Sequence, residues 1–276
     1  MLNVIFETKR IEVELAKQKI PLADIRARAN DCLPVRQFRK SLFDFYNLRS
    51  EVGKGEVNGS DLALIAEVKK ASPSQGLIRE DFDPVKISKI YESSGAQCLS
   101  ILTDQKYFQG DPSFISGVRK EVELPILRKD FINDPYQIYE ARVWGADAIL
   151  LIVAALTKSQ ILDLMEIAAD LSLDVLVEVH NSDEAKIAIE VGAQLIGVNN
   201  RDLNDFSTNL AVSEILIPEI RGAPSVEDLV IVSESALESA EDLDRIAKAG
   251  ACSALIGTAF CKEVDIAQKM RKVLRR

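Results

Sequence analysis

Residues 145–153 read Gly-Ala-Asp-Ala-Ile-Leu-Leu-Ile-Val, a helix-ending dipeptide followed by a run of apolar residues. The same Gly-Ala dipeptide directly precedes three other apolar runs, at 95–96, 192–193 and 250–251, so that these four copies are 50, 47 and 58 residues apart. A glycine in that place is typical of the left-handed residue that ends a helix. The regularity predicts four similar quarters, each built from two strand–helix units.

Eight short apolar runs alternate with longer amphipathic stretches from residue 62 onward, which is typical of repeated βα units and a parallel sheet. Between the runs, apolar residues fall at helical spacing, as at Ile161, Leu164, Met165 and Ala168. Eight strands in four quarters predict an α/β fold, a closed (β/α)8 barrel of the TIM type, rather than an open doubly wound sheet. The predicted strands cover 62–68, 97–103, 124–128, 146–153, 174–179, 194–199, 229–234 and 253–258. No Gly-x-Gly-x-x-Gly follows the first of them, which argues against a dinucleotide-binding fold.

The first 61 residues precede the repeat. Residues 3–20 and 22–29 have helical patterns separated by Pro21, and 42–48 predict a short third helix. We expect a single barrel domain over 1–276 in which 1–61 form an N-terminal helical extension. The pattern favours a structural cap on one end of the barrel over a wall of the functional site.

Composition excludes several functional classes. The chain has 276 residues, 47% of them hydrophobic and 28% charged, as is ordinary for a globular protein. Its formal net charge of −9 argues against a general nucleic-acid surface, which needs basic residues to displace counterions. The longest uninterrupted apolar run, 148–156, is about half of the ~20 residues that span a bilayer. We therefore expect no nucleic-acid or membrane partner and, without a visible secretory signal, a cytoplasmic location.

The cysteines and the single histidine limit the chemistry further. Cys32, Cys98, Cys252 and Cys261 show no Cys-x-x-Cys spacing, and His180 has no second histidine to join it in a metal site. We expect neither a metal centre nor a disulfide framework. His180 follows the point where its strand should end, so we expect it on the polar surface of a loop. Lysine, glutamate and asparagine remain as the candidates for catalysis.

Reactive groups of such barrels lie at the C-terminal ends of the strands and in the loops that follow them. Side chains alternate along a strand, so Glu67 and Lys69 share the face of Ile65, and Lys129 shares the face of Leu127. If the apolar members of each set point into the barrel, so do the charges. The sequence therefore predicts two inward lysines with a glutamate beside them.

Glu178 lies between two valines on the face of Leu176, where an unpaired buried charge costs several kcal/mol. A pairing with Lys69 or Lys129 offsets that cost. The group forms a plausible acid–base set, with an internal salt-bridge network as the alternative interpretation. Asn199 shares an inward face with Gly197 and is suited to orient a substrate hydroxyl or carbonyl, unless it only forms a turn.

The ends of the last two predicted strands carry small and hydroxyl-bearing residues, over 232–236 and 255–259. Such segments suit a phosphate cradle built from backbone N–H groups, although ordinary tight turns look the same. The loop over 70–76 has the serine, proline and glycine content of a mobile lid. These features predict a phosphorylated small-molecule substrate with a second anionic group.

Five stretches, taken in order, closely resemble the indole-3-glycerol-phosphate synthases of tryptophan biosynthesis. They are IAEVKKASPS at 65–74, LTDQKYFQG at 102–110, PILRKDFI at 125–132, IGVNNRDL at 196–203 and SES at 233–235. The resemblance implies a carboxy-lyase that converts 1-(2-carboxyphenylamino)-1-deoxyribulose 5-phosphate to indole-3-glycerol phosphate, CO₂ and water. It also implies that no metal or organic cofactor takes part.

The resemblance implies a role for each matching residue. Lys129 is expected to be the general acid, Lys69 to hold the substrate carboxylate and help deliver protons, and Glu178 to accept a late proton or stabilise a cationic intermediate. Glu67 is expected to position the lysines and the ribulosyl hydroxyls, and Asn199 to bind a hydroxyl. The implied substrate contacts are Ser72, Phe108, Phe131, Arg201, Glu234, Ser235, Ala236, Gly257 and Thr258, with the two phenylalanines around the anthranilate ring.

One residue departs from the family pattern, and other functions stay open. The family usually has Ser-Gly where this chain has Ser235-Ala236, and the extra methyl is expected to raise KM modestly. Another phosphate-binding barrel, such as phosphoribosylanthranilate isomerase, is one alternative. A Schiff-base aldolase that uses Lys129 and a non-catalytic barrel serving as a scaffold subunit are the others.

Overall fold

The computed structural model describes residues 1–52, 57–202, 206–224 and 228–276. Its parallel strands close into a barrel in the order β1-β10-β9-β8-β7-β6-β5-β4. They are β1 Ala63–Val68, β4 Cys98–Leu102, β5 Ile126–Lys129, β6 Ala148–Ile152, β7 Asp174–Val179, β8 Leu195–Asn199, β9 Val230–Glu234 and β10 Ser253–Ile256. The predicted (β/α)8 barrel is confirmed, and each predicted apolar run overlaps one of these strands.

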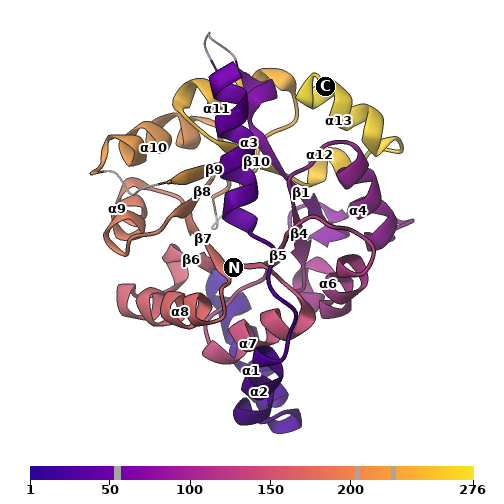
Figure 1. The fold of residues 1–276 in the computed structure, drawn as a ribbon, viewed down its shortest axis with the longest axis vertical. Helices are drawn as coiled ribbons and strands as arrows, with labels where there is room; N and C mark the ends of the chain where they lie inside the picture. The colour runs from indigo at the N-terminus through magenta and orange to yellow at the C-terminus, as the bar shows by residue number, and fades with distance from the viewer. Residues whose placement is uncertain (53–56, 203–205, 225–227) are drawn as a thin grey trace.

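Helices surround the ring of strands (Figure 1). The outer helices are α4 Pro84–Ser93, α6 Pro112–Arg119, α7 Pro135–Trp144, α8 Lys158–Asp170, α9 Ser182–Glu190, α10 Ala211–Gly222, α11 Ala240–Ala249 and α13 Ile266–Leu274. Shorter elements are α5 Gln105–Phe108, α12 Thr258–Cys261, the 3-10 turns η1 Gly59–Asp61 and η2 Val153–Ala155, and the hairpin strands β2 Ala71–Ser72 and β3 Gly76–Leu77. None of the helices described is long and apolar enough to cross a bilayer.

Local sequence signals explain where the helices start and stop. Asp83, Asp111 and Asp134 each cap a helix by accepting backbone N–H bonds, and each is followed by a proline that is preorganised for the first turn. The glycines of the four Gly-Ala dipeptides that precede barrel strands have φ of 88°, 95°, 74° and 99°. The predicted left-handed glycines are therefore confirmed at all four positions.

Two apolar clusters divide the molecule into an interior and an outer layer. Ile65 of β1 packs with Leu127, Leu176 and other residues inside the barrel, whereas its neighbour Leu64 packs in the layer between strands and helices. This alternation follows from the two-residue period of a strand. As a result, every second side chain near the C-terminal end of a strand points into the barrel mouth.

The N-terminal extension reaches both ends of the barrel. It consists of α1 Leu2–Lys19, α2 Leu22–Asn30 and α3 Phe38–Val52, with α2 packed beside α7. Phe38 and Leu42 of α3 join the interior cluster at the first residues of the strands, such as Ala63, and Figure 1 shows α3 lying across the ring. At the opposite end, α1 places Leu2 and Ile5 beside the barrel mouth.

The expectation of a cap at one end was therefore incomplete. α3 closes the base, and α1 forms part of the wall of the mouth. The third helix is also longer than the predicted 42–48, because it begins at Phe38, whose fully buried ring packs under the barrel.

Candidate active site

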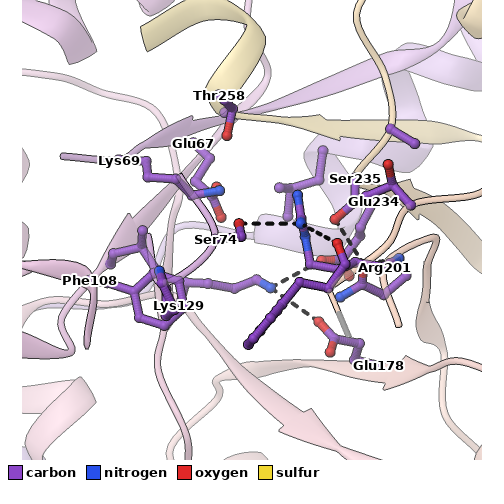
Figure 2. Close-up of a pocket in the computed structure, with 18 of the residues that line it drawn as sticks. Glu67, Lys69, Ser74, Phe108, Lys129, Glu178, Arg201, Glu234, Ser235 and Thr258 are labelled. Carbon is purple, nitrogen blue, oxygen red and sulfur yellow. Dashed lines mark hydrogen bonds and ion pairs between the residues drawn. The ribbon is translucent and has the colours of Figure 1, made fainter. Parts of the chain in front are cut away.

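A cavity of about 410 Å³ opens at the C-terminal ends of the strands (Figure 2). The residues proposed from the sequence that line it are Glu67, Lys69, Phe108, Lys129, Phe131, Glu178, Asn199, Arg201, Glu234, Ser235, Ala236, Gly257 and Thr258. Ser72 is not among the described residues that line this cavity. It lies half-buried in β2, and Pro73 and Ser74 of the same hairpin face the cavity instead.

Lys129 is the centre of the charged group. Its Nζ lies 3.1 Å from Oε2 of Glu178 and 3.1 Å from Oε2 of Glu234, as the dashed lines in Figure 2 mark. Glu67 of β1 forms an ion pair with Lys69, which directly follows that strand. All three carboxylates are buried, so each needs a cation or a hydrogen bond to offset its desolvation.

Burial and mutual interactions set the protonation states of this group. Burial alone lowers the pKa of Lys129, but Glu178, Glu234 and Glu67 together raise it above its ordinary value. Burial raises the pKa of Glu178, whereas Lys129 and His180 outweigh that effect and hold it well below the ordinary range. Lys129 therefore carries a positive charge at neutral pH, and Glu178 a negative one.

Glu234 differs from Glu178 although both carboxylates contact the same lysine. Burial raises the pKa of Glu234 to about 7, against the attraction of Lys129 and with the help of Glu178 and Glu67. Its Oε1 has no hydrogen-bond partner among the residues that the structure describes. Two carboxylates whose environments separate their pKa values are a signature of acid–base assignments. Sequence reasoning grouped Glu234 with the substrate contacts and did not foresee this pairing.

Two glycines make room for the carboxylates. A β-carbon on Gly197 would overlap Oε1 of Glu234, and one on Gly257 would overlap the carboxylate of Glu67. Gly197 lies within β8 and Gly257 directly after β10, and a side chain at either place would displace a charged group. The close packing of the mouth thus depends on the absence of side chains at these two places.

A polar chain connects the loops after β8 and β9. Oδ1 of Asn199 accepts hydrogen bonds from Oγ of Ser235 at 2.8 Å and from the backbone N–H of Arg201 at 3.1 Å. Nη1 of Arg201 donates to Oγ of Ser74 at 3.3 Å and to the carbonyl of Phe206 at 2.9 Å. Arg201 therefore links this side of the mouth to the hairpin after β1. Leu203, the last residue of the matched stretch 196–203, lies outside the described residues.

The remaining walls differ in polarity. Ser235, Ala236, Gly257 and Thr258 line the cavity beside the ends of β9 and β10. Ser235 and Ala236 have φ of 65° and 57°, in the left-handed region that disfavours side chains.

The aromatic wall lies after β4 and β5. The rings of Phe108 and Phe131 have centroids 5.9 Å apart, and Phe6 of α1 meets Phe131 edge-on at 5.8 Å. The cavity therefore combines an apolar wall with a wall of small polar residues.

Lys9 anchors α1 to the site, and sequence reasoning missed it. Its side chain is 5% exposed, and its Nζ lies 2.8 Å from Oδ2 of Asp104 and 3.1 Å from Oδ1 of Asp130. Asp104 caps α5, which carries Phe108, and Asp130 directly follows Lys129. The sequence feature that could have indicated it is the helical spacing of Lys9 from Ile5 and Val13. This spacing places the lysine on the buried face of α1.

His180 corrects a prediction, because it is not on the polar surface. Its side chain is 11% exposed, with Nε2 3.3 Å from Oε1 of Glu178 and Nδ1 3.0 Å from Oε2 of Glu184. Burial lowers its pKa, but the two carboxylates outweigh burial and raise the pKa to about 10. The prediction was wrong because Glu184, four residues along on α9, returns to cover the ring. Within the described residues, no cluster of His, Cys, Asp or Glu could hold a metal ion.

Comparison with known proteins agrees with this geometry. The sequence model of the family described as indole-3-glycerol phosphate synthase matches residues 2–273. The chain is 48% identical over 256 residues to the indole-3-glycerol phosphate synthase of Chlorobium phaeovibrioides, covering 93% of this chain and 92% of that protein. The chain belongs to the indole-3-glycerol phosphate synthase family. The synthase of Roseiflexus castenholzii is 43% identical, with 99% of this chain and 97% of that one covered.

A third relative extends the match to the ends of both chains. The indole-3-glycerol phosphate synthase of Carboxydothermus hydrogenoformans is 41% identical over 99% of each sequence. The resemblance found in five short stretches is thus confirmed over the whole barrel and the N-terminal helices. These findings do not favour phosphoribosylanthranilate isomerase or a non-catalytic scaffold barrel, the alternatives left open by the sequence.

Proposed function

We propose that this chain catalyses the indole-3-glycerol-phosphate synthase reaction as a carboxy-lyase of tryptophan biosynthesis. The substrate is 1-(2-carboxyphenylamino)-1-deoxyribulose 5-phosphate, and the products are indole-3-glycerol phosphate, CO₂ and water. The observation that supports this most is Lys129, whose side chain is only 13% exposed and whose Nζ lies 3.1 Å from each of two carboxylates in the cavity. Family membership supports the choice of substrate.

The substrate has three parts, and the cavity offers a matching wall for each. The anthranilate ring fits against Phe108 and Phe131, and its carboxylate is attracted by the ammonium group of Lys69. The phosphate fits the small residues around Ser235 and Thr258. Arg201 orients the anionic substrate from the side of β8, while Asn199 and Glu67 bind ribulosyl hydroxyls.

Ring closure requires an acid at the ketone oxygen. The new carbon–carbon bond forms between the ring carbon that bears the carboxylate and the ketone carbon, while the ketone oxygen takes a proton from Nζ of Lys129. CO₂ then leaves, and the electrons of the broken bond restore the aromatic ring. Lys129 is suited to the first step because three carboxylates keep its amine protonated.

Dehydration completes the reaction. The new hydroxyl takes a second proton and leaves as water, and Glu178 accepts the proton released from the carbon next to the nitrogen. One net proton is consumed, because the carboxylate departs as neutral CO₂. Glu234 also contacts Lys129 and has a pKa of about 7, so it is suited to return a proton to the lysine between turnovers.

A Schiff-base aldolase is disfavoured by the same electrostatics. Attack on a carbonyl needs an unprotonated amine, and catalytic lysines of that type have lowered pKa values. The carboxylates around Lys129 act in the opposite direction and stabilise its ammonium form. The cytoplasmic location and the lack of a nucleic-acid partner stay predictions from the sequence.

The test is a direct assay. The purified protein is mixed with 1-(2-carboxyphenylamino)-1-deoxyribulose 5-phosphate, without added metal and in the presence of EDTA, and indole fluorescence is followed. We expect fluorescence to rise with turnover. A flat trace from folded protein and intact substrate would overturn the proposal, and borohydride trapping of a keto-phosphate would then test the aldolase alternative.

A further inference from the structure

His180 is the only histidine of the chain, and the chemistry proposed above does not use it. It lies directly after the C-terminal end of β7, and it does not line the 410 Å³ cavity described above. Its imidazole is nevertheless in contact with Glu178, which does line that cavity. A largely covered titratable group in contact with a reacting residue calls for a physical explanation.

The contacts form a row of alternating charges. Glu184 lies 3.0 Å from Nδ1 of His180, Nε2 of His180 lies 3.3 Å from Oε1 of Glu178, and Oε2 of Glu178 lies 3.1 Å from Nζ of Lys129. Each oxygen of Glu178 therefore faces a different cation. The Nε2 contact is an ion-pair contact, since this nitrogen has no hydrogen-bond partner among the described residues.

The far end of the row is held by the backbone. Oε2 of Glu184 also accepts a hydrogen bond from the backbone N–H of His180 at 2.8 Å. Oε1 of Glu184 accepts one from Nδ2 of Asn181 at 2.6 Å. Asn181 in turn caps α9 by accepting the N–H of Glu184 at 3.0 Å. The imidazole is thus fixed on its outer side by a carboxylate that cannot turn without losing its hydrogen bonds to the backbone of His180 and to Asn181.

We propose that His180 is a positioning residue for the reaction. It fixes the Glu178 carboxylate so that Oε2 faces Lys129 and the substrate, and Glu184 orients the imidazole for that purpose. This inference deepens the proposed function and rests on it. His180 touches no substrate atom in this scheme and acts only through Glu178.

Charge balance explains why a cation is needed there. Glu178 and Glu234 both contact Lys129, so a single ammonium group faces two buried carboxylates. A protonated His180 supplies a second positive charge on the other side of Glu178. With that charge removed, Glu178 competes with Glu234 for Lys129 and its carboxylate is free to rotate.

The other charged groups near the ring define what a titration reports. Glu178 from β7 and Glu184 from α9 contact it directly. A second cavity, of about 610 Å³, reaches His180 and Glu184 and is also lined by Arg201, Asp202 and Met1. This cavity offers a small molecule a route to the imidazole site without passage through the main cavity.

The kinetic test uses His180→Ala and His180→Gln in the assay described above. We expect kcat of His180→Ala to fall about 10- to 100-fold with KM little changed, as for a misplaced catalytic group. The acid limb of the pH profile of kcat is expected to move to higher pH, because Glu178 loses a cation that lowers its pKa. His180→Gln keeps a donor but no charge, so we expect the same direction of shift with a smaller loss of kcat.

Rescue separates positioning from simple loss of fold. Imidazole added to His180→Ala is expected to restore part of kcat, and more below its own pKa than above it, where it carries no charge. Lys158→Ala, an exposed change on α8, is the control that imidazole leaves unaffected. A His180→Ala enzyme with normal kcat and an unshifted pH profile would overturn the proposal. A folded variant that loses kcat without a shift or rescue would do the same.

A second measurement does not depend on turnover. Because His180 is the only histidine, the imidazole ¹⁵N NMR signals of the untagged protein report this ring alone. We expect it to stay protonated at pH 8, and its pKa to fall in both Glu178→Gln and Glu184→Gln. If the wild-type enzyme is inactive, the proposed function fails while this titration still tests the row of charges. An imidazole pKa near 6.5 that does not change in either substitution would overturn the inference.

Discussion

The two ends of the barrel both bury carboxylates next to cations, yet they satisfy them in different ways. At the base, Asp147 accepts backbone N–H groups of Arg36 at 2.6 Å and Ile126 at 2.8 Å, and it pairs with Arg119. At the mouth, Glu234 has one contact to Lys129 and a second oxygen with no partner among the described residues. The full set of partners links Asp147 to the segment before α3, whereas Glu234 keeps one oxygen without a partner among the described residues, and burial raises its pKa to about 7.

The cations that pair with these carboxylates also differ between the base and the mouth. The base uses arginine, whose forked guanidinium stays charged and also binds backbone carbonyls, as Arg36 does with Val122 and Leu124. The mouth uses Lys69 and Lys129, each of which carries a single compact ammonium group in place of a planar fork. A buried charge pair is therefore structural or chemical according to its partners, and the residue types alone do not decide which.

The largest expected effect is that of Lys129→Met at the mouth. Loss of the general acid is expected to lower kcat by about 10²–10⁴-fold, because acid–base groups contribute on this scale. The fold is expected to persist, since Glu178 and Glu234 can take up protons when the ammonium is gone. Indole fluorescence gives kcat, and thermal unfolding checks the fold. The matched control is Lys120→Met on the exposed end of α6, and equal activity of the two variants would refute the assignment.

The corresponding change at the base, Asp147→Ala, is expected to act on stability instead. It leaves Arg119 and two backbone N–H groups without their acceptor, which costs about 3–5 kcal/mol of unfolding free energy. The activity of the remaining folded enzyme should be close to normal. Urea unfolding measures the loss, with the exposed Asp163→Ala on α8 as the control. A stable Asp147→Ala enzyme with low kcat would break the comparison between the two ends.

Glu234→Gln tests the pH dependence that burial of this carboxylate produces. Folded Glu234 has a pKa of about 7 and the unfolded residue about 4.5, so between these values the folded state holds a proton that the unfolded state has released. Stability from this group is present below pH 4.5 and is lost as pH rises to 7. In Glu234→Gln, this fall in stability between pH 4.5 and 7 is expected to be absent. Urea unfolding midpoints from pH 4.5 to 8 would measure it.

Glu178→Gln provides the opposite sign. The pKa of folded Glu178 is lowered, so its contribution is present above pH 4.5 and is lost as pH falls below that value. Removing Glu178 is therefore expected to lower the free energy of unfolding chiefly above pH 4.5. If both substitutions shift the urea midpoints in the same direction between pH 4.5 and 7, the two carboxylates are equivalent and the charge assignment is wrong.

Features that local geometry determines could be predicted from the sequence. The two-residue period placed Glu67, Lys129 and Glu178 on the inward face, and the Gly-Ala dipeptides marked the helix ends. The position of Ser72 depends on how a hairpin folds back, and the roles of Lys9 depend on which residues α1 crosses. No local pattern encodes the approach of segments that are more than 90 residues apart, as Lys9 and Asp104 are.

The same limit applies to the base. Asp147 stands in the stretch that decides the fold, two residues after the helix-ending Gly145, and nothing around it indicates a bond to the backbone of Arg36. His180 was misjudged for a related reason. Its partner Glu184 is only four residues away, but the strand-to-helix turn that brings them together is set by packing of α9 on the barrel. Tertiary geometry, and not residue type, determines these sites.

The smallest expected effect is that of Ala236→Gly, at the position where the resemblance to the family implies a glycine. Ala236 has φ of 57°, and a side chain in the left-handed region costs roughly 1–2 kcal/mol. Glycine removes this strain but adds entropy to the unfolded chain, so we expect a net gain of about 1 kcal/mol or less. KM is expected to fall by less than about tenfold, or 1.4 kcal/mol, because the backbone can approach the phosphate more closely.

The matched control makes the same chemical change where the backbone is helical. Ala169→Gly lies on the exposed face of α8 and is expected to destabilise the fold by up to about 1 kcal/mol. Opposite signs for the two substitutions would show that the mouth carries backbone strain that the helical layer does not. If Ala236→Gly destabilises the enzyme as Ala169→Gly does, and KM does not change, then the methyl at 236 is accommodated without strain. The mouth would then differ from the base in its charges alone.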